Sequence, residues 1–387
     1  MQMRRIGFLL SFLVTMQWSA ADIQKAGMLL IDLNATDVAG VGENGKVSSW
    51  ANRATTDGGL GDSFKPAVAG QGPVFKTYAG ASAVYFAGSA NSILTGMVAS
   101  AHVTGTKSWT LETWINTPVL GGTSSYFSWT YRIATAPNNR LFEARWTSDA
   151  GNAIEHYSNN VGWNNRLPIA NQWHHIVFTR RESDKMEFIY VDGSLVTELQ
   201  RPDVNILTDG IFILGGTQNS GRTGFELFAT TYISQLRLHS GFMSQEAATA
   251  NYLAERGTYG QNAQADSVWA GAAGQPLPWE SAANWQNGLT AGTLSRTFIT
   301  NNGLVTLTSN IGTLAALIPS RGGLTLSGSA QIDVNQSTGN YSYFGNGSGN
   351  TFTLNILEGS LSTLNLTNSN HMAFGANSST ALWTLGR

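Results

Sequence analysis

Residues Asn171 to Thr197 constrain the fold of this chain more strongly than any other stretch. From Trp173 to Thr179 the side chains alternate between two faces, which is the period of a β-strand, and apolar residues stand on both faces. The charged segment Arg180 to Lys185 separates this strand from a second apolar run, Met186 to Val191. Asp192-Gly193 follows, and this dipeptide tolerates the positive φ angles of a tight hairpin. The stretch therefore predicts three antiparallel strands, the first of them covered on both sides.

The composition also favours strands over helices. The 387 residues include 43 glycines, and charged residues make up only 12%. Gly, Ser, Thr and Asn punctuate short strands, whereas the long Glu, Lys and Ala runs typical of helices are missing. A formal net charge of -2 gives no electrostatic attraction to nucleic acid or to an anionic membrane. We therefore expect an all-β protein that binds neither.

The first 21 residues are predicted to be a secretory signal peptide. Arg4 and Arg5 precede the apolar run Ile6 to Met16, and small residues follow at Ser19 to Ala21. The run is too short for a permanent membrane anchor. The chain has no cysteine, so disulfides cannot stabilise it. We expect a secreted or cell-surface protein with no transmembrane segment after signal removal.

Further strands and one helix are expected along the first two thirds of the chain. Ser244 to Glu255 favours the helix, because Ser244 can cap it, alanines fill it and Gly257 can end it. The unbroken apolar run Phe188 to Val191 allows a β-bulge. The other strands are expected at Trp109 to Asn116, Tyr126 to Ile133, Arg140 to Trp146, Ile154 to Tyr157, Ile211 to Gly215 and Tyr232 to His239.

The central stretch resembles the middle hairpins of laminin-G-like, concanavalin-A-like jelly-roll domains of bacterial secreted proteins. The resemblance rests on Trp173, His174, His175, Tyr190, Val191, Asp192 and Gly193. It implies a two-sheet antiparallel jelly-roll sandwich over residues 22–260, a fold used by lectins, adhesion modules and, with added carboxylates, glycosidases.

An earlier series of residues in this chain resembles the entry segment of the same modules. It consists of Leu33, Ala35, Asp37, Gly45, Val47, Trp50, Ala83, Val84, Phe86 and Gly88. Such modules often carry Asp residues around that last glycine. This chain has Ala87 before it and Ser89-Ala90-Asn91-Ser92 after it. The carboxylates of a Ca²⁺ site are missing there, so no metal ligand and no cofactor is assigned.

The composition changes after a small polar linker at residues 261–267. Short apolar strands separated by Asn, Gly and Ser turns recur over residues 268–387, which is typical of a β-solenoid. The entry around Trp269, Trp279 and Trp285 resembles solenoid passenger regions of autotransporter-like bacterial surface proteins. The strand pattern continues to the last residues, so a truncated β-solenoid is expected.

A glycosidase on this kind of sandwich needs two carboxylates close together on one face. Glu112 has no second carboxylate on its own face of its strand, so a structural or solvated role is expected. The motif Glu182-x-Asp184-x-x-Glu187 has the order of acids found in glucanases, but it falls on a charged turn, where solvated side chains are expected. No catalytic residue is assigned.

Three further polar residues receive structural interpretations. His174 and His175 are neighbours on a strand and point to opposite faces, so they cannot chelate one metal ion together. Each is expected to be a hydrogen-bonded histidine of the sandwich. Asp192 is expected to be a turn former.

Carbohydrate recognition is the chemistry that the remaining residues favour, because aromatic rings stack on sugar CH groups and planar amides pair with hydroxyls. We predict a glycan site at the loop following Tyr157. Its residues are Asn160, Trp163, Asn164, Asn165 and Arg166, flanked by Trp129, Tyr131, Trp146 and Tyr157. The competing interpretation is that these aromatic residues simply fill the sandwich core.

The function predicted from the sequence is a non-catalytic, secreted or surface module for adhesion or carbohydrate binding. Its expected partner is an extracellular glycan or a surface glycoprotein. Two alternatives remain, a polysaccharide-degrading enzyme and a purely structural surface stalk.

Overall fold

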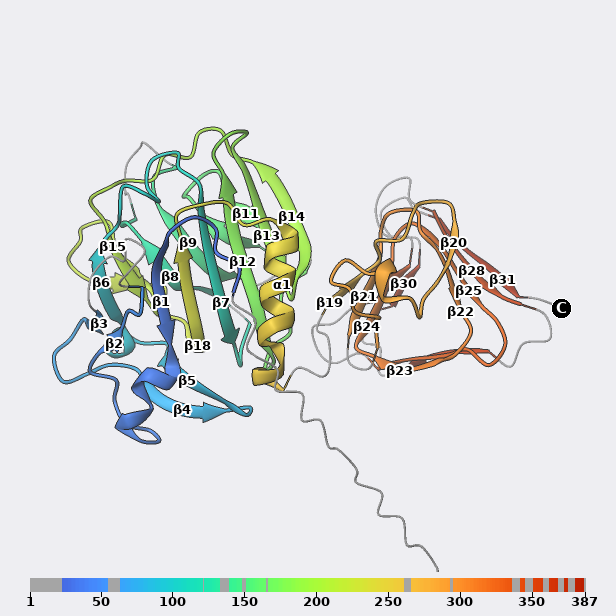
Figure 1. The fold of residues 1–387 in the computed structure, drawn as a ribbon, viewed down its shortest axis with the longest axis horizontal. Helices are drawn as coiled ribbons and strands as arrows, with labels where there is room; N and C mark the ends of the chain where they lie inside the picture. The colour runs from blue at the N-terminus through green and yellow to red at the C-terminus, as the bar shows by residue number, and fades with distance from the viewer. Residues whose placement is uncertain are drawn as a thin grey trace, which may run out of the picture.

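The computed structural model is built almost entirely from β-strands (Figure 1). It describes residues 23–54, 63–120, 122–132, 139–147, 151–164, 166–260, 266–292, 295–335, 342–344, 351–357, 362–367, 372–374 and 380–385. The signal-peptide prediction for residues 1–21 and most of the predicted linker lie outside these ranges. Within them, no helix combines the length and the apolar character needed to cross a membrane.

Two large antiparallel sheets make up the first part of the chain. We call the first of them the helix-side sheet. Its strands are β14 (Ser194–Gln200), β13 (Met186–Val191), β12 (Trp173–Arg181), β7 (Trp109–Asn116), β18 (Thr230–His239), β5 (Ala81–Ala87) and β4 (Val74–Tyr78) in spatial order, with β1 (Leu29–Asn34) also paired to β18.

The opposite sheet pairs the strands that lie between these in the sequence. They are, in spatial order, β11 (Val161–Gly162), β10 (Asn152–Glu155), β9 (Phe142–Thr147), β8 (Thr123–Trp129), β15 (Ile211–Leu214), β6 (Leu94–Val98), β3 (Ser63–Pro66) and β2 (Trp50–Ala51). A small hairpin of β16 (Thr217–Gln218) and β17 (Phe225–Glu226) forms a separate two-stranded sheet. Short 3-10 helices lie at Ala35–Val41, Ala90–Ser92, Arg256–Tyr259 and Ala282–Asn284.

The central hairpins form as the sequence pattern predicts. β12 pairs antiparallel with β13, and β13 pairs with β14 across Asp192 and Gly193, whose φ angles are 51° and 77°. The register shifts between Ile189 and Tyr190, but the extra residue, Val196, lies on β14, so the bulge expected within the run Phe188 to Val191 falls on the partner strand instead. The period of two therefore predicted the strands correctly, and the Asp-Gly dipeptide predicted the turn.

The core lies between the two sheets and is rich in aromatic rings. Phe178 and Trp109 project into it from the helix-side sheet, and Trp129 and Phe142 meet them from the opposite sheet. The ring centroids of Trp129 and Phe142 are 3.9 Å apart, and Trp109 meets Trp129 edge to face at 5.6 Å. The two faces of β12 are both covered, as predicted, because Val177 packs into a second apolar cluster on the outer side.

Helix α1 (Gln245–Glu255) covers the outer face of the helix-side sheet (Figure 1). The hydroxyl of Ser244 caps it by accepting a hydrogen bond from the backbone N–H of Ala247. Gly257 does not end it, because a 3-10 turn follows directly and Gly260, at φ 62°, closes that turn. Tyr252 and Tyr259 stack on Trp114 of β7, which joins the helix to the sheet.

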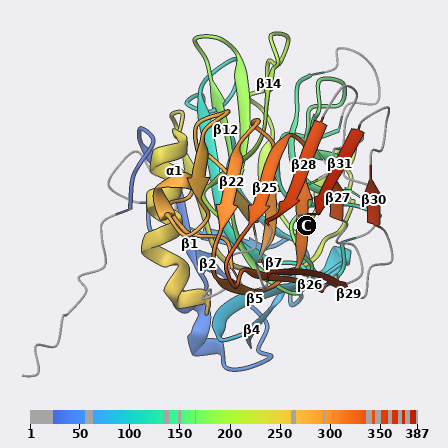
Figure 2. The same ribbon diagram turned by 90° about the vertical axis from the view of Figure 1, so that its right-hand side faces the viewer.

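The second part of the chain consists of short strands paired in parallel (Figure 2). Leu324 lies in register between Val305 and Leu354, so apolar side chains stack along the sheet. The strands are β19 (Asp266–Val268), β21 (Arg296–Ile299) and β24 (Ala316–Pro319); β20 (Pro276–Pro278), β22 (Leu304–Leu307), β25 (Gly322–Leu326), β28 (Thr351–Ile356) and β31 (Thr380–Leu385); β23 (Asn310–Leu314), β26 (Gln331–Asn335) and β29 (Thr363–Thr367); and β27 (Ser342–Phe344) with β30 (Met372–Phe374).

Asp266, predicted as part of the linker, instead starts β19 and is fully buried. Its carboxylate accepts a hydrogen bond from Nε of Arg296 at 2.7 Å and lies 3.5 Å from Nη2 of Arg166. Asn287 also donates to the backbone oxygen of Asp192 in the central hairpin. The second region therefore contacts the first through paired, buried polar groups.

Trp163 tests how far the aromatic core determines stability. The sequence favoured an exposed ring here, but the side chain is fully buried and stacks on Trp146 at 5.4 Å. We expect Trp163→Ala to lower the free energy of unfolding by about 3–5 kcal/mol, because it leaves a large cavity. Val119→Ala, at a side chain that is 69% exposed, should change it by less than about 0.5 kcal/mol. Equal urea midpoints for the two variants would contradict this assignment.

Candidate functional site

The outer face of the opposite sheet carries charged residues at positions set by strand alternation. On β9, Phe142, Ala144 and Trp146 point into the core. Glu143 and Arg145 therefore point the other way, away from the sandwich interior. Both are almost completely buried all the same. Charged side chains are rarely buried unless they are paired, so this face needs a specific explanation.

Glu143, Arg145 and Glu155 form a triad on this face. Glu155 of β10 is the direct cross-strand neighbour of Glu143. Nε of Arg145 donates to Oε2 of Glu143 at 2.5 Å, and its Nη1 donates to Oε2 of Glu155 at 2.9 Å. Asn152 adds a hydrogen bond to the same Glu155 oxygen at 2.7 Å. Two carboxylates thus face each other across one guanidinium group.

The β16–β17 hairpin covers the triad from outside. Its base is fixed to β8, where the Ser128 hydroxyl donates to the backbone oxygen of Gly216 at 3.1 Å. Glu226 on the hairpin accepts a hydrogen bond from Nη1 of Arg132 at 3.1 Å. Nε of Arg132 lies 3.9 Å from Oε1 of Glu143. Arg132 therefore bridges an exposed carboxylate and a buried one.

The carboxyl group of Glu143 is a weaker acid than an ordinary glutamate. Burial raises its pKa, and the neighbouring Arg145, Arg132 and Thr217 hydroxyl oppose this only in part, so the net pKa is above the ordinary value. A carboxyl group with a raised pKa is a frequent feature of functional sites, although structural ion pairs produce it as well.

Two tyrosines with strained surroundings lie at the rim of this face. Arg222 stacks on the ring of Tyr131 at 3.6 Å, and Arg132 lies over the ring of Tyr157 at 5.6 Å. Tyr157 is 38% exposed and has a φ of 80°, and Thr130, next to Tyr131, has a φ of 77°. Such angles are uncommon for residues with a side chain and gather at binding and active sites.

The predicted glycan loop is not assembled as expected. Trp129, Trp146 and Trp163 are buried in the sandwich core, so their rings have no exposed face for a sugar. Strand alternation places Trp129 and Trp146 on the inner side of the sheet, and Trp163 stacks on Trp146 from the following loop, which is the competing interpretation given above. Tyr131 and Tyr157 remain at the surface.

The polar members of the loop have separate roles. Arg166 donates to the backbone oxygen of Leu195 and faces Asp266, so it belongs to the contact with the second region. Asn160 accepts a hydrogen bond from the backbone N–H of His156. Asn164 is exposed, and Asn165 lies outside the described residues. Binding by Asn160 and Asn164 stays a prediction.

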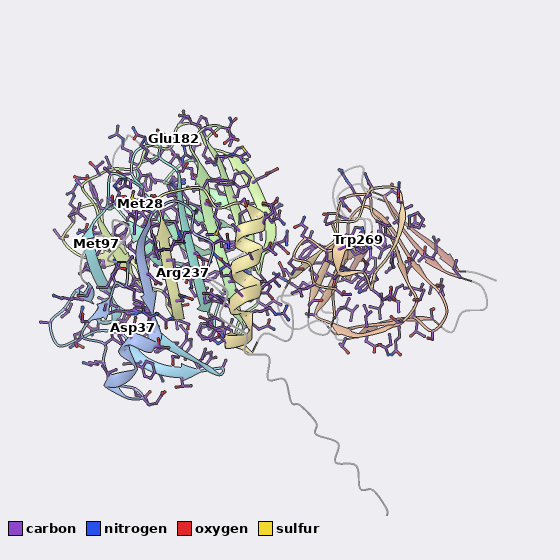
Figure 3. All side chains as sticks on the ribbon, viewed as in Figure 1. Met28, Asp37, Met97, Glu182, Arg237 and Trp269 are labelled. Carbon is purple, nitrogen blue, oxygen red and sulfur yellow. The ribbon has the colours of Figure 1, made fainter. Side chains whose placement is uncertain are left out.

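Glu112 forms a second buried charge cluster, beneath helix α1. Its carboxylate accepts hydrogen bonds from Nε2 of His175 at 2.8 Å, Asn251 Nδ2 at 2.9 Å and Nε2 of His239 at 3.2 Å. Nη1 of Arg237 lies 3.3 Å away, and Figure 3 shows Arg237 on the sheet beside the helix. The role is structural, as predicted, but the side chain is buried rather than solvated.

The histidine tautomer in this cluster follows from its partners. The backbone N–H of Ala26 donates to Nδ1 of His239 at 3.4 Å, so Nδ1 is the acceptor and Nε2 carries the hydrogen that it donates to Glu112 in a hydrogen bond. Burial raises the pKa of Glu112, but Arg237 and the hydrogen bonds from both histidines outweigh it and hold this pKa well below the ordinary range.

The Glu112 cluster contains side chains of the types that bind metal ions. Single ligand atoms of Glu112, His175 and Glu255 lie within 4.8 Å of one another. Arg237, however, already pairs with both carboxylates. A divalent ion would sit beside this guanidinium group, so the charges favour Arg237 as the counter-ion.

The glucanase-like acid motif is split by the fold. Glu182 and Asp184 lie on the exposed turn, as predicted. Glu187 does not: it is buried in the sandwich, with Nη1 of Arg180 at 2.8 Å and Nε2 of His156 at 3.0 Å. Glu187 is buried rather than solvated because it already belongs to β13, where it lies opposite Arg180 of β12.

The triad was missed because its members come from two strands. The alternation Phe142-Glu143-Ala144-Arg145-Trp146 is nevertheless visible in the sequence and places two charges on one face. Only the pairing of β9 with β10 reveals that Glu155 joins them. His174 and His175 do face opposite sides, as predicted, since Nδ1 of His174 contacts Asp192 and His175 contacts Glu112.

Part of the chain matches a known family. Residues 76–248 match the model described as the concanavalin A-like lectin/glucanases superfamily. This range holds the triad and both rim tyrosines, and it agrees with the resemblance found in the sequence. No curated protein matches the chain significantly.

Several solved structures resemble parts of the chain. The carbohydrate-binding module of the Ruminococcus gnavus IT-sialidase, bound to α2,3-sialyllactose, is 12% identical and covers 39% of this chain and 84% of its own, with a TM-score of 0.31. The Trypanosoma rangeli sialidase is 12% identical and covers 60% of this chain and 33% of its own, with a TM-score of 0.38. The NanB sialidase from Streptococcus pneumoniae is 19% identical and covers 38% of this chain and 24% of its own, with a TM-score of 0.31. The chain thus spans a third or less of either sialidase, and a function has to be argued from its own residues.

The low pKa of Glu112 predicts how stability depends on pH. Its pKa is lower in the folded than in the unfolded chain, so the stabilisation is present above the unfolded value of about 4.5 and is lost as the pH falls. We expect Glu112→Gln to lower the free energy of unfolding by about 3 kcal/mol at pH 7, because it removes the most deeply buried of the carboxylates that pair with Arg237. Urea titrations at pH 7 and pH 3 should show the difference from the wild type shrinking at pH 3. A difference of the same size at both values would refute the assignment.

Proposed function

We propose that the chain is a non-catalytic glycan-binding protein whose binding surface is the rim of the opposite sheet. The observation that carries this is the pair of surface tyrosines, Tyr131 and Tyr157, each stacked with an arginine. Aromatic faces offer sugars a stacking surface, and guanidinium groups offer hydroxyls paired donors. The match of residues 76–248 to a lectin and glucanase superfamily supports the same class.

The surroundings of the two tyrosines fit a binding surface. The side chains of Arg132 and Glu226 are 28% and 41% exposed, so polar groups of both charges border the rings. The cluster below holds them in place, because Arg132 lies above Glu143 and Glu143 is fixed by Arg145. A rigid support of this kind reduces the entropy lost on binding.

A second function, polysaccharide cleavage, is favoured by one specific observation. Glu143 and Glu155 are opposed carboxylates, and the pKa of Glu143 is raised. In such an enzyme Glu143 would donate a proton to the glycosidic oxygen, and Glu155 would act as nucleophile or base. Against it, Arg145 occupies the space between the two groups and all three are buried. We therefore rank it below binding.

We also propose a secreted or surface location and a β-solenoid for the second region. The predicted signal peptide supports the location. The parallel ladders from β20 through β22, β25 and β28 to β31 support the solenoid, because successive coils of a solenoid stack their strands in this way. A surface protein with such an extension would hold the binding sandwich away from its anchor.

Glycan binding should depend on the two rim tyrosines. We expect Tyr157→Ala and Tyr131→Ala each to weaken binding on a glycan array by about tenfold, since each ring contributes one stacking surface. Tyr85→Ala is a matched control, because Tyr85 is a half-buried tyrosine on the helix-side sheet. Circular dichroism should show all three variants folded. Equal binding by all of them would rule out this surface.

Catalysis can be tested separately. If the second function is right, the wild type releases reducing ends from at least one polysaccharide of a broad panel. Glu143→Gln should then lower that rate by about a hundredfold or more, because it removes the proton donor. No release from any member of the panel would exclude cleavage of those polymers and leave the binding proposal in place.

A further inference from the structure

We propose that the sandwich and the second region are locked into one rigid body by Asp266, whose carboxylate lies between Arg166 of the sandwich and Arg296 of the second region. The sandwich therefore keeps one orientation relative to the parallel strands instead of swinging on a linker. This inference does not depend on the proposed glycan-binding function, because it concerns only the contact between the two regions.

The joint contains a carboxylate that is buried between two guanidinium groups. Asp266 begins β19, which lies on the side of the second region that faces helix α1 (Figure 1). Nε of Arg296 donates to this carboxylate at 2.7 Å, and Nη2 of Arg166 lies 3.5 Å from it. Nη1 of Arg296 also donates to the backbone oxygen of Leu167 in the sandwich. All three charged side chains are almost completely buried, and such groups persist only when they are paired. The two regions thus share one charge cluster.

Amide side chains of the second region bind the central hairpin of the sandwich. Oε1 of Gln286 accepts hydrogen bonds from the backbone N–H of Leu195 at 3.2 Å and from Nε2 of Gln245 at 3.4 Å. Nδ2 of Asn287 donates to the backbone oxygen of Asp192 at 3.4 Å. Leu195 begins β14 directly after the turn, and Gln245 begins helix α1. The joint is therefore anchored on regular elements of the sandwich that are themselves paired or packed.

Apolar contacts supply attraction between the two regions. Leu289 of the second region packs against the sandwich cluster that contains Trp173 and Tyr259. The guanidinium group of Arg166 lies over the ring of Phe298, 4.4 Å from its centroid. Burial of apolar surface favours contact but has no preferred direction, so these contacts alone would let one region slide over the other.

The charge cluster prevents that sliding. A buried ion pair adds little net attraction, because the loss of hydration offsets most of the Coulomb energy. A small displacement of one region, however, leaves Asp266 or one of its arginines buried without a partner, which is strongly unfavourable. Two regions joined by a linker ordinarily move relative to each other. Here the apolar contacts hold the regions together, and the charges select one orientation.

Distances between two spin labels test whether the joint is rigid. The chain has no cysteine, so labels can be attached at two engineered positions, Leu253→Cys on helix α1 and Leu357→Cys directly after β28. Both side chains are exposed, so the labels should not disturb the packing. We expect double electron–electron resonance on the full chain to give one narrow distance distribution. A broad distribution, or several separate distances, would overturn the inference.

Substitutions in the labelled chain link the rigidity to the carboxylate. Asp266→Asn keeps the size of the side chain but leaves two buried guanidinium groups together, so the distribution should widen about twofold or more. Arg166→Gln perturbs the contact from the sandwich side and should widen it as well. Glu280→Gln is the matched control, because Glu280 is an exposed acid that accepts hydrogen bonds from Thr308 and Ser309 of its own region. It should leave the distribution narrow.

The two substitutions at the joint also guard against a folding defect. Circular dichroism of each labelled variant shows whether it is folded, and Arg166→Gln carries the test if Asp266→Asn is not. A distribution that stays narrow in the folded variants would mean that other contacts fix the joint, and would overturn the role given to Asp266. Neither result alters the glycan array, so this inference can fail while the proposed function stands.

Discussion

Pairing of charge on the outer faces of the two sheets is the constraint on which the structure depends. A sandwich buries its inner faces with apolar rings, and this chain also covers parts of both outer faces, one with helix α1 and one with the β16–β17 hairpin. Carboxylates that stand on those faces lose their water. They persist only where arginine, histidine or amide groups replace it.

The two outer clusters meet this constraint to different degrees. Glu112 receives donors from β12, β18 and α1 at both of its oxygens, and its pKa falls. Glu143 is paired with Arg145, but its burial outweighs the opposing interactions and its pKa rises. The Glu112 carboxylate therefore ties the helix to its sheet, whereas the loss of water around Glu143 is compensated less completely.

Much of the fold could be predicted from local pattern. The strand from Trp109 to Asn116 and the pair from Trp173 to Val191 have a clear period of two, and the Asp192-Gly193 turn predicts the hairpin that joins β13 to β14. The site could be predicted much less well. Trp163 looked like a loop residue because Gly and Asn flank it, but the stack on Trp146 draws it inward.

The sequence by itself determined the strands, the capped helix and which residues share a face, because these follow from spacing along a single segment. Only the tertiary structure decided that Glu155 stands beside Glu143, that Glu187 meets His156, and that Asp266 closes a contact between the two regions. Each of these contacts joins residues from separate segments of the chain. Such contacts depend on how the segments pack against one another, which the spacing of residues within one segment does not specify.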